Sequence, residues 1–246
     1  MTTCFKLAIA SAFSIALLSA CGGGGGGSDV PPPAAAAAPV QQSSAVTSFD
    51  LQSGYKALVA AGKSTNFTIS GFCAGSATIT TSAPSVGTFE GASALAAATT
   101  STINLTNCTP ASTAATSTGY FDSNYNPIGH SAAGVEYGKF LTVPTPLPTS
   151  VKVGDTAEFA IESIYTDSSK QTAKGKRNLS YVIESDGTST NTAIVNLISR
   201  DFNTASQLLF TQQSRYRMAA SGPLTAVSID VQYSTTSSTH LVYSAK

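Results

Sequence analysis

The sequence predicts an all-β fold built mainly from antiparallel strands. Apolar and polar residues alternate along several stretches, as they do in strands that bury one face. Turn-forming stretches rich in Gly, Ser, Asn and Asp separate them. Charged residues make up only 11% of the 246 residues, against about 25% in an average globular domain. Ser, Thr, Asn and Gln take their place, a composition usual for exported β proteins.

The first twenty residues are typical of a secretory signal. Lys6 precedes an uncharged run from Leu7 to Ala20 that is dominated by Leu, Ile, Phe and Ala. As a helix this run would reach about 21 Å, which is short of the roughly 30 Å hydrocarbon core of a bilayer. It therefore fits the apolar region of a signal peptide, residues 1–20, with a buried core helix as the alternative.

The residues Leu18-Ser19-Ala20-Cys21 resemble the lipobox of bacterial lipoprotein precursors. The resemblance implies cleavage before Cys21, a diacylglyceryl group on its sulfur and an acyl chain such as palmitate on its new amino group. Two or more acyl chains hold a protein firmly on a bilayer. Gly22 follows the cysteine, which by resemblance to the enterobacterial sorting rule implies the outer membrane, facing the periplasm or the cell surface. An ordinary signal peptide is the alternative.

Residues 21–48 are expected to be the anchored cysteine and a flexible tether of Gly, Pro, Ala and Ser. Glycine loses much backbone entropy when it is ordered, and a coil of this length reaches roughly 30 Å. The β-rich domain then covers residues 49–246. A proline-rich stretch at 144–150 marks either a boundary between two lobes or a guarded strand edge.

From Val151 onward the sequence predicts a meander of about six antiparallel strands. In 226–233, for example, Val227, Ile229 and Val231 alternate with polar residues. The connections are too short for helical crossovers between parallel strands. We expect the sheet to curl, or to pack on the N-terminal strands as a sandwich or half-barrel.

The N-terminal part of the domain is less regular. One or two short helices are expected, at 55–61 and in the alanine-rich stretch 91–99. Strands are expected at 66–73, 76–81, 101–108, 117–121 and 135–143.

Cys73 and Cys108 are the only cysteines left in the body of the chain, because Cys4 lies in the signal and Cys21 takes lipid. In an oxidising compartment this pair predicts one disulfide, with two buried free thiols as the alternative. The loop-entropy model gives such a bond roughly 4 kcal/mol.

Three short motifs resemble functional sites only in part. Residues 60–65 end like a phosphate-binding loop, but Ala57 stands where its first glycine is needed. Ser131 lies in a stretch that lacks the second glycine of a nucleophile elbow. Asp122, Asn124 and Asn126 are weak calcium candidates, for which an Asx-rich turn is the plainer interpretation.

The charged residues suggest no nucleic-acid partner and no cofactor. The formal net charge is zero, whereas nucleic-acid binding requires clustered cations. His130 and His240 are expected to be polar loop or surface residues, and Glu158 and Glu162 to share one strand face too far apart for glycoside hydrolysis. A group of cations is interpreted as a charged hairpin that guards a sheet edge, or as a contact for lipopolysaccharide or phospholipid head groups: Lys170, Lys174, Lys176 and Arg177.

The stretches 151–159, 180–186 and 192–202 resemble the bodies of uncharacterised proteobacterial lipoproteins, a group that implies no activity. The sequence therefore predicts a lipid-anchored envelope protein without enzymatic function, which binds or supports another envelope component. A carrier or sensor of an apolar ligand is the first alternative. A hydrolase that uses scattered Ser, His and carboxylate residues is the second.

Overall fold

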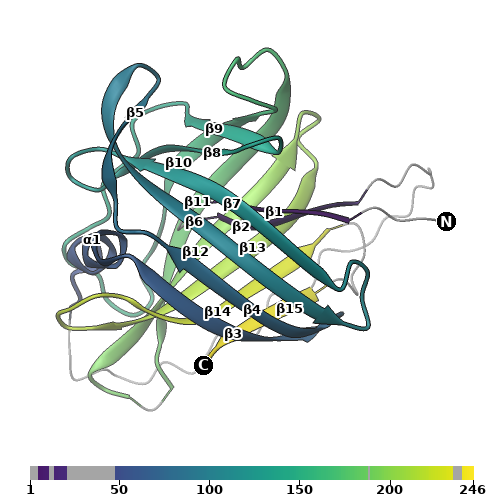
Figure 1. Cartoon of the computed structure of the whole chain (residues 1–246). Coiled ribbons are helices and arrows are strands. Elements are labelled where there is room, and N and C mark those ends of the chain that lie inside the picture. Colours follow the sequence, from purple (N-terminus) through teal and green to yellow (C-terminus); the bar gives the residue numbers. More distant parts are fainter. Residues whose placement is uncertain (1–4, 11–13, 21–47, 188, 235–239) are drawn as a thin grey trace.

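The computed structural model describes residues 5–10, 14–20, 48–187, 189–234 and 240–246 (Figure 1). It contains one large antiparallel sheet, a separate two-stranded hairpin and, within the described residues, a single helix. The all-β class is therefore confirmed. Cys21 and residues 22–47 of the predicted tether lie outside the described residues.

The large sheet closes on itself as a barrel of twelve strands (Figure 1). Each strand pairs antiparallel with its two neighbours, and the circle is completed where β15 pairs with β3 and where β4 pairs with β6. The barrel strands are β3 (Lys63–Gly71), β4 (Ala74–Thr81), β6 (Ala92–Thr106), β7 (Ser112–Phe121), β8 (Pro127–Ala132), β9 (Glu136–Phe140), β10 (Thr156–Tyr165), β11 (Ala173–Ser185), β12 (Thr192–Asn203), β13 (Leu208–Ala219), β14 (Thr225–Tyr233) and β15 (His240–Ala245).

The predicted sandwich or half-barrel is wrong. Strands β10 to β15 do form an antiparallel meander, as the alternation after Val151 indicates. The N-terminal strands, however, join this meander edge to edge rather than face to face. Residues 67–71 of β3 pair with residues 241–245 of β15, so the sheet needs no second layer. Closure satisfies the backbone groups that open edges would expose.

The alanine-rich stretch 91–99 is part of a strand, not the helix expected from its composition. Strand β6 runs from Ala92 to Thr106 and pairs with β7 along most of its length. On its other edge it pairs first with β5 (Ser85–Phe89) and then with β4. Hydrogen-bonded neighbours on both sides outweigh the intrinsic helix preference of alanine.

The other N-terminal expectations hold in outline. Each predicted strand overlaps an observed one, whereas β5 and β8 were not predicted. The expected helix exists as α1 (Leu51–Ala61) and begins four residues earlier, because Asp50 caps it by accepting a 2.9 Å hydrogen bond from the Ser53 amide. Gly62 ends it with a positive φ of 59°.

Cys73 and Cys108 form the predicted disulfide, with their Cα atoms 5.9 Å apart. Cys73 lies between β3 and β4, and Cys108 follows β6. The bond therefore lies just beyond the last residue pair of β4 and β6, Ala74 and Thr106. It ties together two strands that are separated in sequence by β5.

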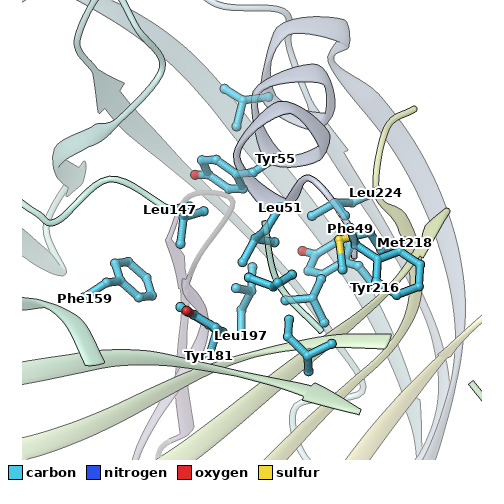
Figure 2. Close-up of a cluster of buried hydrophobic side chains, with 14 of the residues drawn as sticks. Phe49, Leu51, Tyr55, Leu147, Phe159, Tyr181, Leu197, Tyr216, Met218 and Leu224 are labelled. Atoms are coloured by element: carbon cyan, nitrogen blue, oxygen red, sulfur yellow. The ribbon is translucent and has the colours of Figure 1, made fainter. Parts of the chain in front are cut away.

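Helix α1 and the segment that follows β9 fill one end of the barrel. Twelve strands enclose more space than the eight whose side chains fill a barrel unaided. Figure 2 shows Leu51 and Tyr55 of α1 above the inward side chains of Tyr181 and Leu197, with Leu147 beside them. All five side chains are buried. A second apolar cluster lines the inside of β3, β4, β14 and β15.

Strands β1 (Phe5–Ala10) and β2 (Ser14–Ala20) pair antiparallel as a hairpin that is not part of the barrel sheet. Within the described residues, no helix has the length and hydrophobicity needed to cross a lipid bilayer.

Candidate functional site: a buried charge cluster

Five ionisable side chains project into the barrel from five consecutive strands. Each is between 1% and 5% exposed, although isolated charges are very costly to remove from water. We call this group the lumen charge cluster. It consists of His130 on β8, Glu136 on β9, Glu162 on β10, Arg177 on β11 and Asp201 on β12.

Strand register brings these residues together. Arg177 is the direct partner of Glu162 across the β10–β11 ladder and of Asp201 across the β11–β12 ladder. Side chains directly opposite each other in an antiparallel ladder lie on the same face and within contact distance. Arg177 therefore sits between two carboxylates because of the pairing itself.

His130 is held by a carboxylate at each ring nitrogen. Its Nδ1 lies 2.8 Å from Glu162 Oε1, and its Nε2 lies 2.9 Å from Glu136 Oε1. A carboxylate only accepts hydrogen bonds, so both nitrogens carry protons. Burial favours the neutral ring, but Glu162 and Glu136 outweigh it and raise the pKa of His130 to about 9. The side chain is an imidazolium at neutral pH.

Arg177 binds all three carboxylates of the cluster. Its Nε donates to Asp201 Oδ1 at 2.8 Å, and its two terminal nitrogens lie 3.1 Å from Glu136 Oε1 and 3.4 Å from Glu162 Oε2. The planar guanidinium suits this arrangement because its donors point outward in one plane. Burial disfavours its charge, yet the three carboxylates raise the pKa of Arg177 further above its ordinary value.

The cluster contains one more carboxylate than cation, and a third cation lies near it. Lys174 Nζ is 4.0 Å from Glu136 Oε2 and partly exposed. Burial opposes ionisation of Glu136, but Arg177 and His130 lower its pKa well below the usual value. For Asp201, burial outweighs the contact with Arg177 and raises the pKa. Asp201 is thus the first of these two carboxylates to take up a proton as the pH falls.

Gly138 on β9 makes room for the His130–Glu162 contact. A Cβ atom at this position would lie 2.2 Å from His130 Cε1 and 2.3 Å from Glu162 Oε1. Both distances are far inside van der Waals contact. A glycine is therefore required where the imidazole crosses the backbone of β9.

Ser131 and His130 point to opposite faces of β8, because successive residues of a strand alternate. The Ser131 hydroxyl lies 3.1 Å from the Tyr120 hydroxyl, while His130 is in the lumen. His240 belongs to neither group: its Nε2 contacts Asp230 Oδ1 at 2.5 Å on a partly exposed part of β15. The structure therefore does not bring Ser131 together with either histidine.

The calcium candidates form a turn. Asp122 Oδ1 accepts hydrogen bonds from the amides of Asn124 and Asn126 at 2.8 and 2.9 Å, and its Oδ2 accepts one from the Asn126 side chain. This is the Asx-type arrangement expected of such a sequence. Within the described residues, no group of three or more His, Cys, Asp and Glu side chains is suited to a metal ion.

Each of the four cations in the predicted group has a contact of its own. Lys170 Nζ lies 2.7 Å from both oxygens of Glu90, and Lys174 Nζ donates to the Val135 carbonyl at 2.9 Å. Lys176 lies over the Phe202 ring. Arg177 is inside the barrel rather than on the hairpin surface, so the expectation of a charged exposed hairpin is wrong for this residue.

The expected common face of Glu158 and Glu162 is also wrong. The ladder between β10 and β11 shifts register between Glu158 and Ala160. Glu158 is exposed and contacts Asn178, whereas Glu162 is buried in the lumen. An irregularity of this kind changes the face on which later residues lie.

One signal in the sequence could have identified the cluster. Arg177 has the same parity as the apolar residues Leu179, Tyr181 and Ile183, so alternation places its side chain on the buried face of β11. A cation in phase with a buried face implies buried anionic partners. The identity of those partners depends on barrel closure and register, which alternation does not give.

Comparison with known proteins adds no relative: no family model, no curated protein and no solved structure matches this chain.

Proposed function

We propose that this chain is the precursor of a lipid-anchored lipoprotein of the bacterial cell envelope, whose barrel is a non-catalytic binding or structural module. Its place is the outer membrane, facing the periplasm or the cell surface. The observation that carries the module role is the state of His130. Both of its ring nitrogens bind buried carboxylates, so neither is free to accept a proton from a nucleophile.

The anchor is proposed from the lipobox-like residues 18–21 and the Gly/Pro/Ala-rich stretch that follows. The described domain is compatible with such an anchor, because its first residue, Ser48, is exposed to solvent. Phe49 pairs with Val151 through two backbone hydrogen bonds of 2.8 and 2.9 Å, and Asp50 caps α1. A flexible segment between Cys21 and Ser48 would keep the barrel roughly 30 Å from the acyl chains.

Replacement of Cys21 by serine tests the anchor. In cells that process bacterial lipoproteins, Cys21→Ser should leave the chain unacylated and at precursor mass, whereas Cys4→Ser is the matched control and should be processed normally. Intact-mass spectrometry and membrane fractionation measure both properties. An unmodified Cys21 sulfur in the wild-type protein would contradict the proposal.

The carrier alternative receives less support. A site for an apolar ligand of drug size measures about 300–1,000 Å³, whereas the cavity beside α1 has a volume of about 70 Å³. The hydrolase alternative would need a serine or bound water at His130, and both of its nitrogens are occupied. Screening the purified protein with ester and amide substrates tests this point: turnover that disappears in His130→Gln but not in His240→Gln would favour the hydrolase.

A further inference from the structure

Strand β5 belongs to the large sheet but stands outside the closed ring. It covers Ser85–Phe89 and pairs with residues 92–96 at the start of β6. Farther along, the same edge of β6 pairs with β4, which is a member of the ring. Residues 85–96 therefore extend the sheet past the ring as a two-stranded flap, and Figure 1 shows β5 at the upper left of the molecule.

The second edge of β5 has no strand beside it in the part of the chain that the structure describes. Alternate residues of a strand direct their N–H and C=O groups toward the same edge, so this edge presents a row of backbone donors and acceptors. Its residues are accessible: Ser85, Val86 and Thr88 are exposed, and 83% of Val86 is open to solvent. The edge is therefore available to a further strand.

Side-chain contacts hold the flap against the outside of the barrel. Phe89 is buried and packs on the rings of Tyr120 and Tyr137, with centroids 4.7 and 5.5 Å away. Glu90, in the turn between the two strands, accepts a hydrogen bond from Lys139 at 2.8 Å. A strand that adds to β5 would meet an edge that is already ordered, which lowers the entropy cost of binding.

The free edge lacks the features that usually keep such edges from pairing. Natural proteins guard an edge strand with lysine, with proline or with a bulge. The stretch Ser-Ala-Pro-Ser-Val-Gly-Thr-Phe at 82–89 contains no charged residue, and its one proline, Pro84, precedes β5. The ladder between β5 and β6 runs without a register shift. An exposed, ordered and unguarded edge indicates that β5 pairs with a strand of another molecule.

The sequence of β5 suits pairing with a second copy of itself. When two copies pair antiparallel about Gly87, Val86 of one copy lies opposite Thr88 of the other, and Gly87 lies opposite Gly87. Val86 and Thr88 lie on the exposed face, because Phe89 has the opposite parity and is buried. Cross-strand pairs of β-branched residues are favourable, and the uncharged stretch brings no like charges together.

We propose that two copies of this protein associate through β5, antiparallel about Gly87, so that their flaps form one continuous sheet. Five residues of strand are about 17 Å long. Such a contact is smaller than a standard interface, which buries about 1,200–2,000 Å², so the dimer is weak and reversible. The proposal goes beyond the proposed envelope role and does not depend on the lipid anchor.

Sedimentation equilibrium of the full chain in density-matched detergent tests the proposal. The wild type at up to about 1 mM should show a reversible monomer–dimer equilibrium. Val86→Lys places a guard lysine on the edge and should weaken dimerisation at least tenfold. Val143→Lys is the matched control, because Val143 is 90% exposed and lies outside β5, and it should dimerise like the wild type. A wild type that stays monomeric, or equal dimerisation of wild type and Val86→Lys, would overturn the proposal.

A charge-reversal pair tests the register. In Val86→Lys/Thr88→Glu each new lysine lies opposite the new glutamate of the other copy, so this double variant should dimerise at least threefold more tightly than Val86→Lys alone. Val86→Lys/Thr204→Glu has the same net charge, with the glutamate at an exposed site between β12 and β13, and should remain as weak as Val86→Lys. All three variants should keep the Tm of the wild type, since the altered side chains are exposed. Equal affinities of the two double variants would refute pairing about Gly87.

Discussion

Arg177 is the side chain on which the lumen charge cluster depends. It contacts Glu136, Glu162 and Asp201, all of them buried, and each would lose its guanidinium partner if Arg177 were removed. Buried ion pairs contribute little compared with well-packed apolar residues, but removal of one partner leaves uncompensated charges away from water. Loss of a single member is therefore costly, although the intact cluster adds little to the stability of the fold.

We expect Arg177→Leu to lower the free energy of unfolding by about 3–5 kcal/mol, the usual cost of breaking a buried ion pair. The matched control is Arg217→Leu, because Arg217 bonds Asp186 on the barrel surface with half of its side chain exposed. That change should cost at most about 1 kcal/mol. Urea denaturation of both variants measures the difference, and equal losses would contradict a special role for the lumen.

Gly138→Ala should destabilise the barrel by about 1–3 kcal/mol, since the added methyl overlaps His130 and Glu162. Gly87→Ala on β5 is the control: its nearest contact would be 3.2 Å from the Ala96 Cβ, a much smaller intrusion. Thermal denaturation compares the two. If Gly138→Ala is as stable as Gly87→Ala, the imidazole does not occupy the space that the structure gives it.

At the scale of elements, alternation predicts most of the fold correctly. After Val151 it predicts a meander of about six antiparallel strands, and six are observed there, β10 to β15. It fails at 91–99, where alanine is compatible with either structure and pairing with β4, β5 and β7 decides. It also misses β8, whose inward residues include His130 rather than a run of large apolar side chains.

The disulfide should stabilise the pairing of β4 with β6. The two cysteines are 35 residues apart, and the loop they close contains all of β5. We expect the double variant Cys73→Ala/Cys108→Ala to lose roughly 4 kcal/mol by the loop-entropy model. Urea denaturation of the oxidised wild type against this variant gives the value. Reduced wild type is the control and should match the variant within about 1 kcal/mol, and no difference among the three would contradict the expectation.

At the scale of the whole molecule, closure is the feature that sequence could not supply. Alternation states which face of each strand is buried, but a sandwich and a barrel bury the same face. The outcome depends on whether β3 meets the edge of β15, and these strands lie at opposite ends of the domain. Alternation cannot predict the charge cluster either, because its five members come from five different strands.

The charge cluster should make the stability of the whole barrel depend on pH. The pKa of His130 is raised from an ordinary 6.5 to about 9 in the fold, so its contribution is fully present below pH 6.5 and is lost as the pH rises through 9. Between pH 6.5 and 9.5, the wild type should lose about 3 kcal/mol relative to His130→Gln. Denaturation curves at several pH values measure this loss. His240→Gln should behave like the wild type, and parallel pH profiles of wild type and His130→Gln would contradict the assignment.

The pairing of β3 with β15 also affects how the chain folds during its synthesis. Every other neighbouring pair of strands is adjacent or nearly so along the chain, and such local hairpins assemble quickly. The ring, in contrast, stays open until β15 has been synthesised. A nascent chain that pauses before that point presents two bare sheet edges to its surroundings, which makes it a natural client for chaperones.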